Sequence, residues 1–176
     1  MDCEPTRSTV VCYAALMTLY FAYGSNMSRA SMAARCPGAR PLGVATLAGW
    51  RFIIGADGYA SIVPAPGGEV IGVLWRIGLR DVAALNAYEG IDRGLYRRSN
   101  VTLRHQGRIR SAMAYIGRAG GEARPRPGYV QQVVTAARDW DLPERYIHGL
   151  QRWSAAGLGN RAVETGQAGG RPCAMS

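Results

Sequence analysis

The sequence predicts a mixed α and β domain, in which a small curled sheet or β-barrel is flanked by helices. A chain of 176 residues suits one domain of ordinary size, and 48% hydrophobic residues are enough to form a core. Runs typical of strands and of helices follow one another without regular βαβ alternation, which argues against a Rossmann-type parallel sheet. No apolar run approaches the ~20 residues of a membrane-spanning helix, so we expect no membrane partner.

Short apolar runs between turn-forming residues are the predicted strands. The run EVIGVLWRI, at 69–77, is the clearest of them, because it is long, apolar and typical of a buried strand. The runs on either side of the sequence HQG, at 105–107, predict a hairpin. The sequence PAPGG, at 64–68, is expected to end the strand before it. The predicted strands are 18–23, 41–47, 51–54, 61–63, 69–77, 96–103 and 110–116.

Four segments with a helical spacing of apolar residues are the predicted helices. The segment 79–88 places Leu79, Val82 and Leu85 on one stripe and ends at Gly90, a typical helix stop. The other predicted helices are 28–35, which ends before a Pro-Gly pair, 129–140, and 143–153, whose apolar face is Tyr146, Ile147, Leu150 and Trp153.

The two ends of the sequence are predicted to lie outside the domain. Residues 1–16 begin acidic and lack the long apolar core of a signal peptide, so they predict a loose extension, and Met17 is a candidate natural start. Residues 154–176 are small, polar and rich in glycine, which is typical of a flexible tail. The predicted domain is therefore 17–153.

The cysteines and histidines predict neither a metal site nor a disulfide framework. The four cysteines are far apart in the sequence and form no CxxC pair. His105 and His148 have no neighbour at ligand spacing. We expect a cytoplasmic protein that uses no metal.

The chain is strongly basic, with a net charge of +9, and all 21 of its basic residues are arginine. Such a charge suits binding to nucleic acid, to an acidic surface or to small anionic substrates. Nucleic-acid binding favours arginines that are clustered on one helix or interleaved with aromatic residues. Here they are scattered, and only Arg97 and Arg98 are adjacent. The sequence therefore predicts an arginine-rich solvated surface and no nucleic-acid partner.

The segment TLYFAYGSNM, at 18–27, combines a buried strand with a turn and a helix start. Gly24 allows a sharp backbone turn, and the free N–H groups at the start of the next helix can hold a carbonyl oxygen or an anion. The segment therefore predicts a cradle for a substrate oxygen. An ordinary turn, in which Asn26 or Ser28 caps the helix, is the alternative.

Glu89 and Tyr129 are two further candidate functional residues. Glu89 follows a predicted helix at its C-terminal end, where the helix dipole disfavours a negative charge, so its pKa is expected to be raised toward neutrality. Such a pKa suits proton transfer, although Arg93 nearby would act the other way, and a solvated surface acid is the alternative. If Glu89 is not the base, Asp92 is the next acid to consider. Tyr129 is either a hydrogen-bond donor to a substrate or a core tyrosine.

Several segments of the chain also occur together, in this order, in a known family. They are YFAYGSNM, the strand EVIGVLW with the helix after it, YEGIDRGLYRR, the proline-rich loop with Tyr129, and AARDWDLPERYIHGL. From about 17 to 153, the chain resembles the gamma-glutamylcyclotransferase-like family, which includes the AIG2-like proteins. The resemblance implies a cyclisation of the lyase or acyltransferase type. The α-amine of a γ-glutamyl amide attacks its own γ-carbonyl and releases 5-oxoproline and a free amino acid or amine, without water or cofactor.

The resemblance also assigns roles to residues of this chain. It implies that Glu89 is the catalytic general acid and base, which takes a proton from the attacking amine and returns one to the leaving group. It implies that the N–H groups of the YGSN turn stabilise the charge on the carbonyl oxygen. The substrate-binding residues that it implies are Tyr20, Phe21, Ala22, Tyr23, Gly24, Ser25, Asn26 and Tyr129.

The identity of the leaving group stays open at this point. This chain has ADGYASIVP where many members carry a glycine-rich stretch. The substrate is either a γ-glutamyl amino acid or dipeptide, or a γ-glutamylated amine or natural product that loses a protecting group. The arginine-rich loops 92–98 and 118–126 favour a leaving group with a carboxylate. A non-catalytic binding module of the same fold is a third reading, and the protein is expected to be a monomer or a homodimer.

Overall fold

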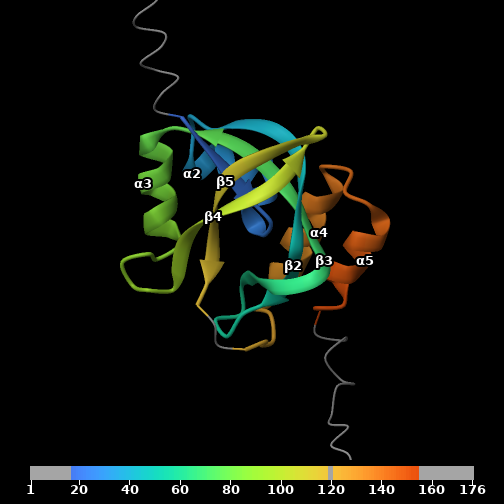
Figure 1. Cartoon of the computed structure of the whole chain (residues 1–176). Coiled ribbons are helices and arrows are strands. Elements are labelled where there is room, and N and C mark those ends of the chain that lie inside the picture. The colour runs from blue at the N-terminus through green and yellow to red at the C-terminus, as the bar shows by residue number, and fades with distance from the viewer. Residues whose placement is uncertain (1–16, 119–120, 155–176) are drawn as a thin grey trace, which may run out of the picture.

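The computed structural model describes residues 17–118 and 121–154. The extension predicted at 1–16 and nearly all of the tail predicted at 154–176 lie outside these residues. Within them, five strands close into a barrel, and α-helices pack around it (Figure 1). This confirms the predicted fold class. The strands are β1 (Thr18–Ala22), β2 (Arg40–Ile54), β3 (Ala60–Ile77), β4 (Tyr96–His105) and β5 (Arg108–Gly117).

The barrel has the strand order β1-β3-β2-β4-β5 and is closed by a contact between its first and last strands. Strand β1 pairs antiparallel with the end of β3, where Phe21 lies opposite Leu74. On its other side β1 pairs parallel with β5, where Tyr20 lies opposite Met113. The last three residues of β1 are buried, and they lead into the part of the molecule where the candidate site lies.

The structure joins strands that the sequence predicts as separate. Strand β2 contains both 41–47 and 51–54, and β3 contains both 61–63 and 69–77, so the PAPGG sequence does not end its strand. The register shifts around Gly49, which has a φ of +79°. The left-handed conformation at this glycine lets the ribbon bend without losing its pairing, and prolines are tolerated at such an irregular point.

The β4–β5 hairpin agrees with the sequence prediction. Tyr96 pairs with Gly117 at its open end and His105 pairs with Arg108 at its tip. The two residues between the strands, Gln106 and Gly107, have φ values of +48° and +73°. Two positive φ angles are typical of a type I′ turn, whose twist matches that of the paired strands.

The helices lie on opposite sides of the barrel in Figure 1, with α3 on one side and α4 and α5 on the other. A short 3₁₀ helix, η1, follows β1 and leads into α2. The helices are η1 (Ser25–Met27), α2 (Arg29–Arg35), α3 (Leu79–Tyr88), α4 (Tyr129–Arg138) and α5 (Glu144–Gln151). The helices predicted at 129–140 and 143–153 are therefore present but shorter, and Pro143 is the N-cap of α5 rather than its first residue.

The apolar stripe predicted on α3 is only partly correct. Leu85 is fully buried and Val82 packs against the core, but Leu79 is 61% exposed because it is the first residue of the helix. Asp81 replaces it at the buried start of the helix, where its carboxylate accepts a hydrogen bond of 3.0 Å from the N–H of Gly78. This contact satisfies one of the N–H groups that a helix start leaves free.

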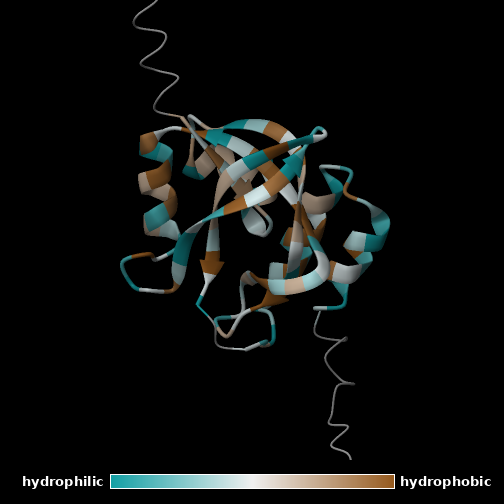
Figure 2. Ribbon diagram, viewed as in Figure 1, coloured by the Kyte–Doolittle hydropathy of each residue, from teal (hydrophilic) through white to brown (hydrophobic). Residues whose placement is uncertain are grey.

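The core joins the barrel interior to the inner faces of α4 and α5. Phe21, Met27, Leu74 and Ile147 are among its fully buried side chains. Burial of a side chain of this size contributes about 1.5–3 kcal/mol to stability. Figure 2 shows the hydrophobic positions on the strands through the middle of the molecule and hydrophilic ones on the outer turns of α5.

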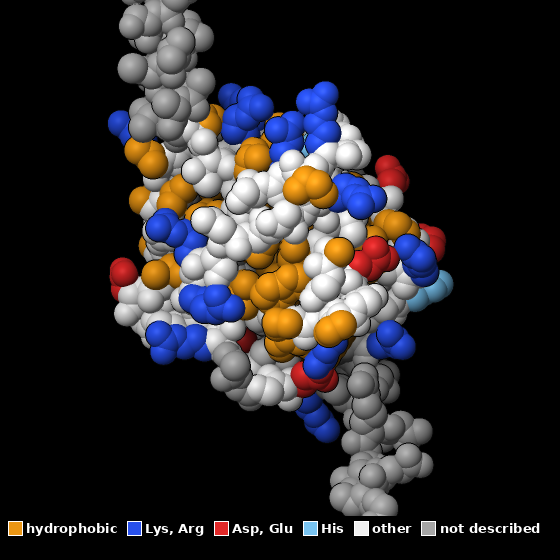
Figure 3. All heavy atoms as spheres, in the orientation of Figure 1, with side chains coloured by type: hydrophobic (Ala, Val, Ile, Leu, Met, Phe, Trp, Pro, Cys, Tyr) orange, Lys and Arg blue, Asp and Glu red, His pale blue; other side chains and the backbone are white. Residues whose placement is uncertain are grey.

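The surface in Figure 3 carries arginine side chains spread around the molecule rather than gathered on one element. Two of them form ion pairs with glutamates, Arg51 with Glu122 and Arg145 with Glu69. Across 17–118 and 121–154, no helix is long and apolar enough to cross a membrane. In the same residues, no three His, Cys, Asp or Glu side chains are grouped so that they could hold a metal ion.

Candidate active site

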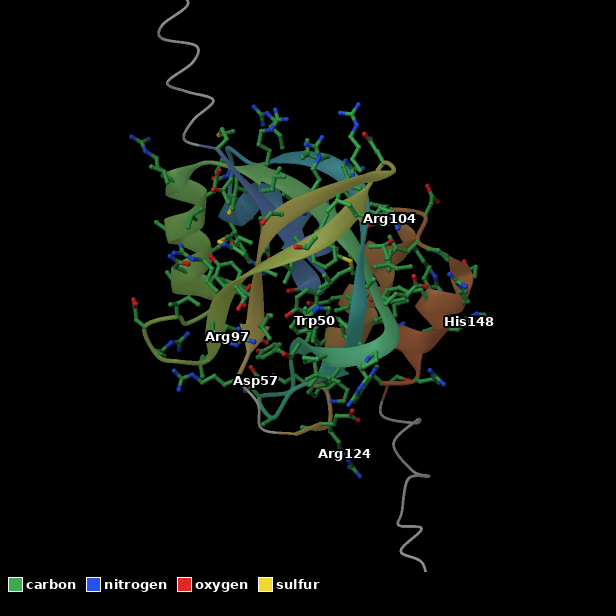
Figure 4. The ribbon with its side chains drawn as sticks, in the orientation of Figure 1. Trp50, Asp57, Arg97, Arg104, Arg124 and His148 are labelled. Carbon is green, nitrogen blue, oxygen red and sulfur yellow. The ribbon has the colours of Figure 1, made fainter. Side chains whose placement is uncertain are left out.

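A cavity of about 370 Å³ lies where β1 meets three loops. These loops join β2 to β3, α3 to β4 and β5 to α4, and all three lie at the lower end of the molecule in Figure 1. Figure 4 shows Asp57, from the first of them, at this end of the barrel. The lining residues are Tyr20, Tyr23, Gly24, Ser25, Asn26, Asp57, Tyr59, Ala60, Tyr88, Glu89, Arg93, Leu95, Tyr96, Tyr115, Arg126 and Tyr129.

Seven of the nine residues that the sequence analysis assigns to the site line this cavity. The two exceptions are Phe21 and Ala22. Both are buried in the hydrophobic core, 0% and 1% exposed, and neither reaches the cavity. The ring of Phe21 lies instead on the neighbouring strand β3, beside Gly72. Successive side chains of a strand point to opposite faces, so a contiguous sequence motif cannot place all of its side chains in one cavity.

The turn after β1 presents backbone donors at the cavity. The N–H of Met27 donates to the carbonyl of Gly24 at 3.0 Å, and the N–H of Ser28 donates to the carbonyl of Ser25 at 3.1 Å. Within the described residues, the N–H groups of Ser25 and Asn26 have no backbone acceptor. Because Ser25 and Asn26 line the cavity, this turn can hold an oxygen atom of a bound molecule.

The structure also decides which residue caps the next helix. Ser28 is the N-cap of α2, since its side chain accepts a hydrogen bond of 3.3 Å from the N–H of Ser31. Asn26 does not cap the helix. Its side chain is 4% exposed and points toward the cavity residues, where its Nδ2 donates both to Oε1 of Glu89 and to the hydroxyl of Tyr20, each at 2.9 Å.

Glu89 is the C-cap of α3, and its half-buried carboxyl faces the cavity. Burial raises its pKa from 4.5 to about 7, the positive charge of Arg35 and the hydrogen bond from Asn26 act against this rise, and the charge of Asp57 adds to it. The predicted direction of the shift is therefore confirmed, but its main cause is burial. The alternative of a solvated surface acid is wrong, and the opposing arginine is Arg35 instead of Arg93.

Tyr129 begins α4, with its ring in the core and its hydroxyl at the cavity. Its ring is buried and packs edge-on against Tyr59, with ring centroids 5.0 Å apart. Its hydroxyl lines the cavity and accepts a hydrogen bond of 3.2 Å from the N–H of Ala60. Burial raises its pKa to about 12, so the hydroxyl keeps its proton at neutral pH and can donate it to a ligand.

Three more tyrosines around the cavity are held by hydrogen bonds to fixed acceptors. The hydroxyl of Tyr96 donates to the carbonyl of Ala60 at 2.9 Å, and that of Tyr23 donates to the carbonyl of Tyr115. The hydroxyl of Tyr115 donates to Oδ1 of Asn86 at 2.7 Å. Burial raises the pKa of all three phenols. These three phenols therefore keep their protons at neutral pH, and their hydrogen bonds fix their places around the carboxyl of Glu89.

Charged residues stand at the cavity on the side of the loops. Arg126 donates from Nε to the carbonyl of Asp57 at 3.1 Å, and its guanidinium lies over the ring of Tyr59 at 5.0 Å. Arg93, from the loop after α3, also lines the cavity. Asp92, which the sequence analysis ranks next after Glu89, is exposed and does not line it, so Asp57 is the second acid of the site.

A family model described as "Gamma-glutamyl cyclotransferase, AIG2-like" matches residues 20–142. The chain belongs to this family, which confirms the resemblance found in the sequence.

Curated relatives and solved structures agree with the family model. The chain is 30% identical over 144 residues to proteins named gamma-glutamylcyclotransferase from Mus musculus and from Homo sapiens, covering 76% of this chain and 77% of each relative. A solved structure named gamma-glutamyl cyclotransferase superposes with a TM-score of 0.72 at 29% identity, over 77% of this chain and 86% of that one. YkqA from Bacillus subtilis shares the fold, with a TM-score of 0.68 at 24% identity, over 82% of this chain and 56% of that one.

Proposed function

We propose that this protein is a gamma-glutamylcyclotransferase, which cyclises a γ-glutamyl amide to 5-oxoproline and releases an amino acid or amine. The observation that carries the proposal is the Glu89 carboxyl, whose burial raises its pKa to about 7 and which Asn26 holds at 2.9 Å. A carboxyl with this pKa accepts and returns protons at neutral pH. The names of the relatives and the family of the chain support the same reaction.

The reaction is balanced without water or a second substrate. The α-nitrogen of the glutamyl group bonds to its own γ-carbon, and the bond from that carbon to the leaving nitrogen breaks. The α-ammonium loses two protons as it becomes the lactam N–H, and the leaving nitrogen gains two as it departs as an ammonium group. Glu89 is suited to carry each of these protons in turn, and its own protonation state is unchanged at the end.

The rest of the cavity has two tasks in this proposal. Attack within one molecule is already favoured, with effective molarities of about 10⁵–10⁸ M for well-oriented groups, so the walls need only hold the glutamyl chain in its folded form. The carbonyl oxygen gains negative charge as the ring closes. The N–H groups of Ser25 and Asn26, and the protonated hydroxyl of Tyr129, are the donors suited to stabilise it.

The charges at the loops favour one class of leaving group. Arg93 and Arg126 line the cavity beyond Glu89, and a guanidinium is suited to hold a carboxylate. A γ-glutamyl amino acid or dipeptide has such a carboxylate in its leaving group, whereas a simple γ-glutamyl amine has none. We therefore favour the amino acid or dipeptide over a γ-glutamylated amine.

The test is a screen of γ-glutamyl amino acids, dipeptides and amines, with 5-oxoproline detected by mass spectrometry. Glu89→Gln keeps the size of the side chain and an oxygen that accepts from Asn26, but it removes the titrating proton. Its activity should fall about 10²–10⁴-fold while circular dichroism stays unchanged. Asp92→Asn is the matched control, because it neutralises an exposed acid close in sequence that does not line the cavity.

Two outcomes would contradict the proposal. If the folded protein releases no 5-oxoproline from any compound of the screen, it is a non-catalytic member of the fold. If Glu89→Gln keeps activity within about threefold of the parent, the carboxyl of Glu89 is not the proton carrier. The search for the base would then move to Asp57, the other acid of the cavity.

A further inference from the structure

Arg35, the last residue of α2, does not line the cavity but contacts two groups beside Glu89. Its Nη1 donates to Oδ1 of Asn26 at 2.7 Å. Its Nη2 donates to the hydroxyl of Tyr88 at 2.8 Å, and its guanidinium lies 3.9 Å over the ring of the same tyrosine. Since Tyr88 precedes Glu89 in the chain, these contacts tie α2 to the turn of α3 that carries the carboxyl.

The first of these contacts determines which way the Asn26 amide points. A side-chain amide has an oxygen that accepts and an NH₂ group that donates, and a guanidinium has donors only. With Oδ1 of Asn26 facing Arg35, the NH₂ group faces away, and its two hydrogens go to Glu89 and to Tyr20. A flipped amide would place its NH₂ group against the guanidinium and its oxygen against the carboxyl of Glu89, so both contacts would become repulsive.

We propose that Arg35 is a positioning residue for the proton transfer, which acts through Asn26 to hold the Glu89 carboxyl in its place in the cavity. This inference rests on the proposed function of Glu89. Arg35 differs from the arginines that are exposed on the surface, because it is partly buried and lies between Asn26 and Tyr88. Both hydrogens of the Asn26 amide are already used, so only its oxygen can bind a further group, and that group must be a donor. The Arg35 guanidinium supplies this donor and a second one, to Tyr88, in fixed directions.

Arg35 and Asp57 are the two charged groups that shift the pKa of Glu89, and they shift it in opposite directions. Asp57, from the β2–β3 loop, raises the pKa of Glu89, whereas Arg35, from α2, lowers it. The other groups at the same cavity are Arg93 and Arg126, from the loops before β4 and α4, and the tyrosines Tyr20, Tyr23, Tyr59, Tyr88, Tyr96, Tyr115 and Tyr129. Loss of the charge of Arg35 should therefore raise the pKa of Glu89 further.

The test compares Arg35→Gln and Arg35→Lys with Arg40→Gln, using kcat and KM for 5-oxoproline release across pH. Arg35→Gln should lower kcat about ten- to a hundredfold with little change in KM, and should move the acidic limb of the kcat/KM profile to higher pH. Arg35→Lys keeps the charge but not the two directed donors, so the limb should stay in place while kcat still falls. Arg40 is an exposed arginine close in sequence whose side chain, among the described residues, donates a hydrogen bond only to the carbonyl of Ala39, and its variant should match the parent.

A double-mutant cycle tests whether Arg35 acts through Asn26. In an Asn26→Ala background, Arg35→Lys should have almost no further effect on kcat, because the amide that it orients is gone. Additive losses would show that Arg35 acts by another route and would overturn the proposal. An Arg35→Gln protein that equals Arg40→Gln in both kcat and the acidic limb would overturn it as well.

Carbon-13 NMR of the glutamate carboxyls separates this inference from the proposed function. If the parent releases no 5-oxoproline, the proposed function fails, but the titration of Glu89 is still measurable in the parent and in both Arg35 variants. The positioning role predicts a higher midpoint for Glu89 in Arg35→Gln than in the parent, and a near-parental midpoint in Arg35→Lys. Equal midpoints in all three proteins would overturn it.

Discussion

The hydroxyl of Tyr129 lies directly against the α-carbon of Gly24. A Cβ atom at Gly24 would be 2.8 Å from that hydroxyl and 3.0 Å from the Cβ of Ala60. The φ of Gly24 is −119°, so no left-handed conformation calls for glycine here, but the space beside its α-carbon is too small for a side chain. This close approach brings the N–H groups of the YGSN turn and the tyrosine hydroxyl to the same wall of the cavity.

The first prediction is that Gly24→Ala damages the site and the fold together. The methyl group must push Tyr129 or the turn aside, and such overpacking costs about 1–3 kcal/mol of stability. Displacement of the wall should also lower the rate of 5-oxoproline release. The measurements are urea unfolding and kcat/KM for the best substrate.

Gly149→Ala is the matched control for this change. A Cβ at Gly149, in α5, meets no atom within 4 Å, and alanine is favoured over glycine in a helix by about 1 kcal/mol. The control should be as stable as the parent or more so. If Gly24→Ala unfolds at the same urea concentration as the parent and keeps its activity, the cavity wall is not as close-packed as the structure has it.

The second prediction is that Tyr129→Phe weakens both stability and substrate binding. The change keeps the ring against Tyr59 and removes the acceptor of the Ala60 N–H. A lost hydrogen bond of this kind costs about 0.5–1.5 kcal/mol, and a buried donor left without a partner costs about 1–3 kcal/mol. We expect a lower Tm and a higher KM, with a smaller effect on kcat. The increase in KM should correspond to the free energy of one lost hydrogen bond.

This loss should not depend on pH in the neutral range. Burial raises the pKa of Tyr129 to about 12, so the parent hydroxyl is protonated there and makes the same contacts throughout. A ratio of parent to variant kcat/KM that stays constant with pH would agree with this role. An unchanged kcat/KM would instead assign Tyr129 to the core alone.

Much of the fold follows from local patterns in the sequence. The hairpin at 105–107 is set by two residues that accept positive φ, and the β3 run at 69–77 is apolar along almost its whole length. The split of β2 into two predicted strands is wrong because a local pattern treats Gly49 as an end. In the barrel, pairing with β3 on one side carries the strand through this bend. The prediction that Leu79 belongs to the buried stripe of α3 is wrong for a similar reason, because periodicity does not show at which residue a helix stops contacting the core.

The site depends more on the closed barrel than on any local pattern. Tyr96 and Tyr115 come from β4 and β5, far along the chain from the YGSN turn, and only the parallel contact between β1 and β5 brings them to the cavity. The sequence predicts a raised pKa for Glu89 from its helix, but burial by these distant elements is the larger cause. The role of Arg35 could not be read from its spacing, because its partner Tyr88 lies 53 residues away.

The third prediction concerns the bounds of the domain, which we propose to be 17–153. Ile147 and Leu150, on α5, are buried, and the ring of Trp153 lies edge-on to Phe52 with centroids 6.4 Å apart. A fragment of 17–153 should therefore unfold in the same cooperative thermal transition as the full chain and keep its activity. A shorter fragment that ends at 142 lacks α5 and should lose much of its stability, because it exposes the core that α5 covers.

The fragments also show how this proposal can fail. If 17–153 unfolds without a cooperative transition while the full chain does not, residues beyond these bounds belong to the folded unit. If the fragment that ends at 142 is as stable as the full chain, α5 contributes little, and the buried positions of Ile147 and Leu150 do not matter for folding.

The last prediction follows from the pKa of Glu89 and concerns stability rather than rate. The carboxyl has its ordinary pKa of 4.5 when unfolded and about 7 when folded, so between these values the folded state binds a proton that the unfolded state does not. Stability then decreases as pH rises across this window and becomes constant above it. Glu89→Gln carries no such proton. Relative to the parent, it should gain stability as pH rises from 4.5 to about 7, by about 3 kcal/mol at most.

The measurement is urea unfolding of both proteins at several pH values, with Asp92→Asn as the control for the change in net charge. The difference in the free energy of unfolding between Glu89→Gln and the parent should grow through the window. It should level off near the pH at which the kcat/KM profile of the parent has its acidic midpoint. Agreement between the two midpoints would assign both to one carboxyl, because a rate midpoint and a stability midpoint are measured independently. A stability difference that stays constant between pH 4.5 and about 7 would show that the folded protein does not raise the pKa of Glu89, and the proton carrier would then have to be sought at Asp57.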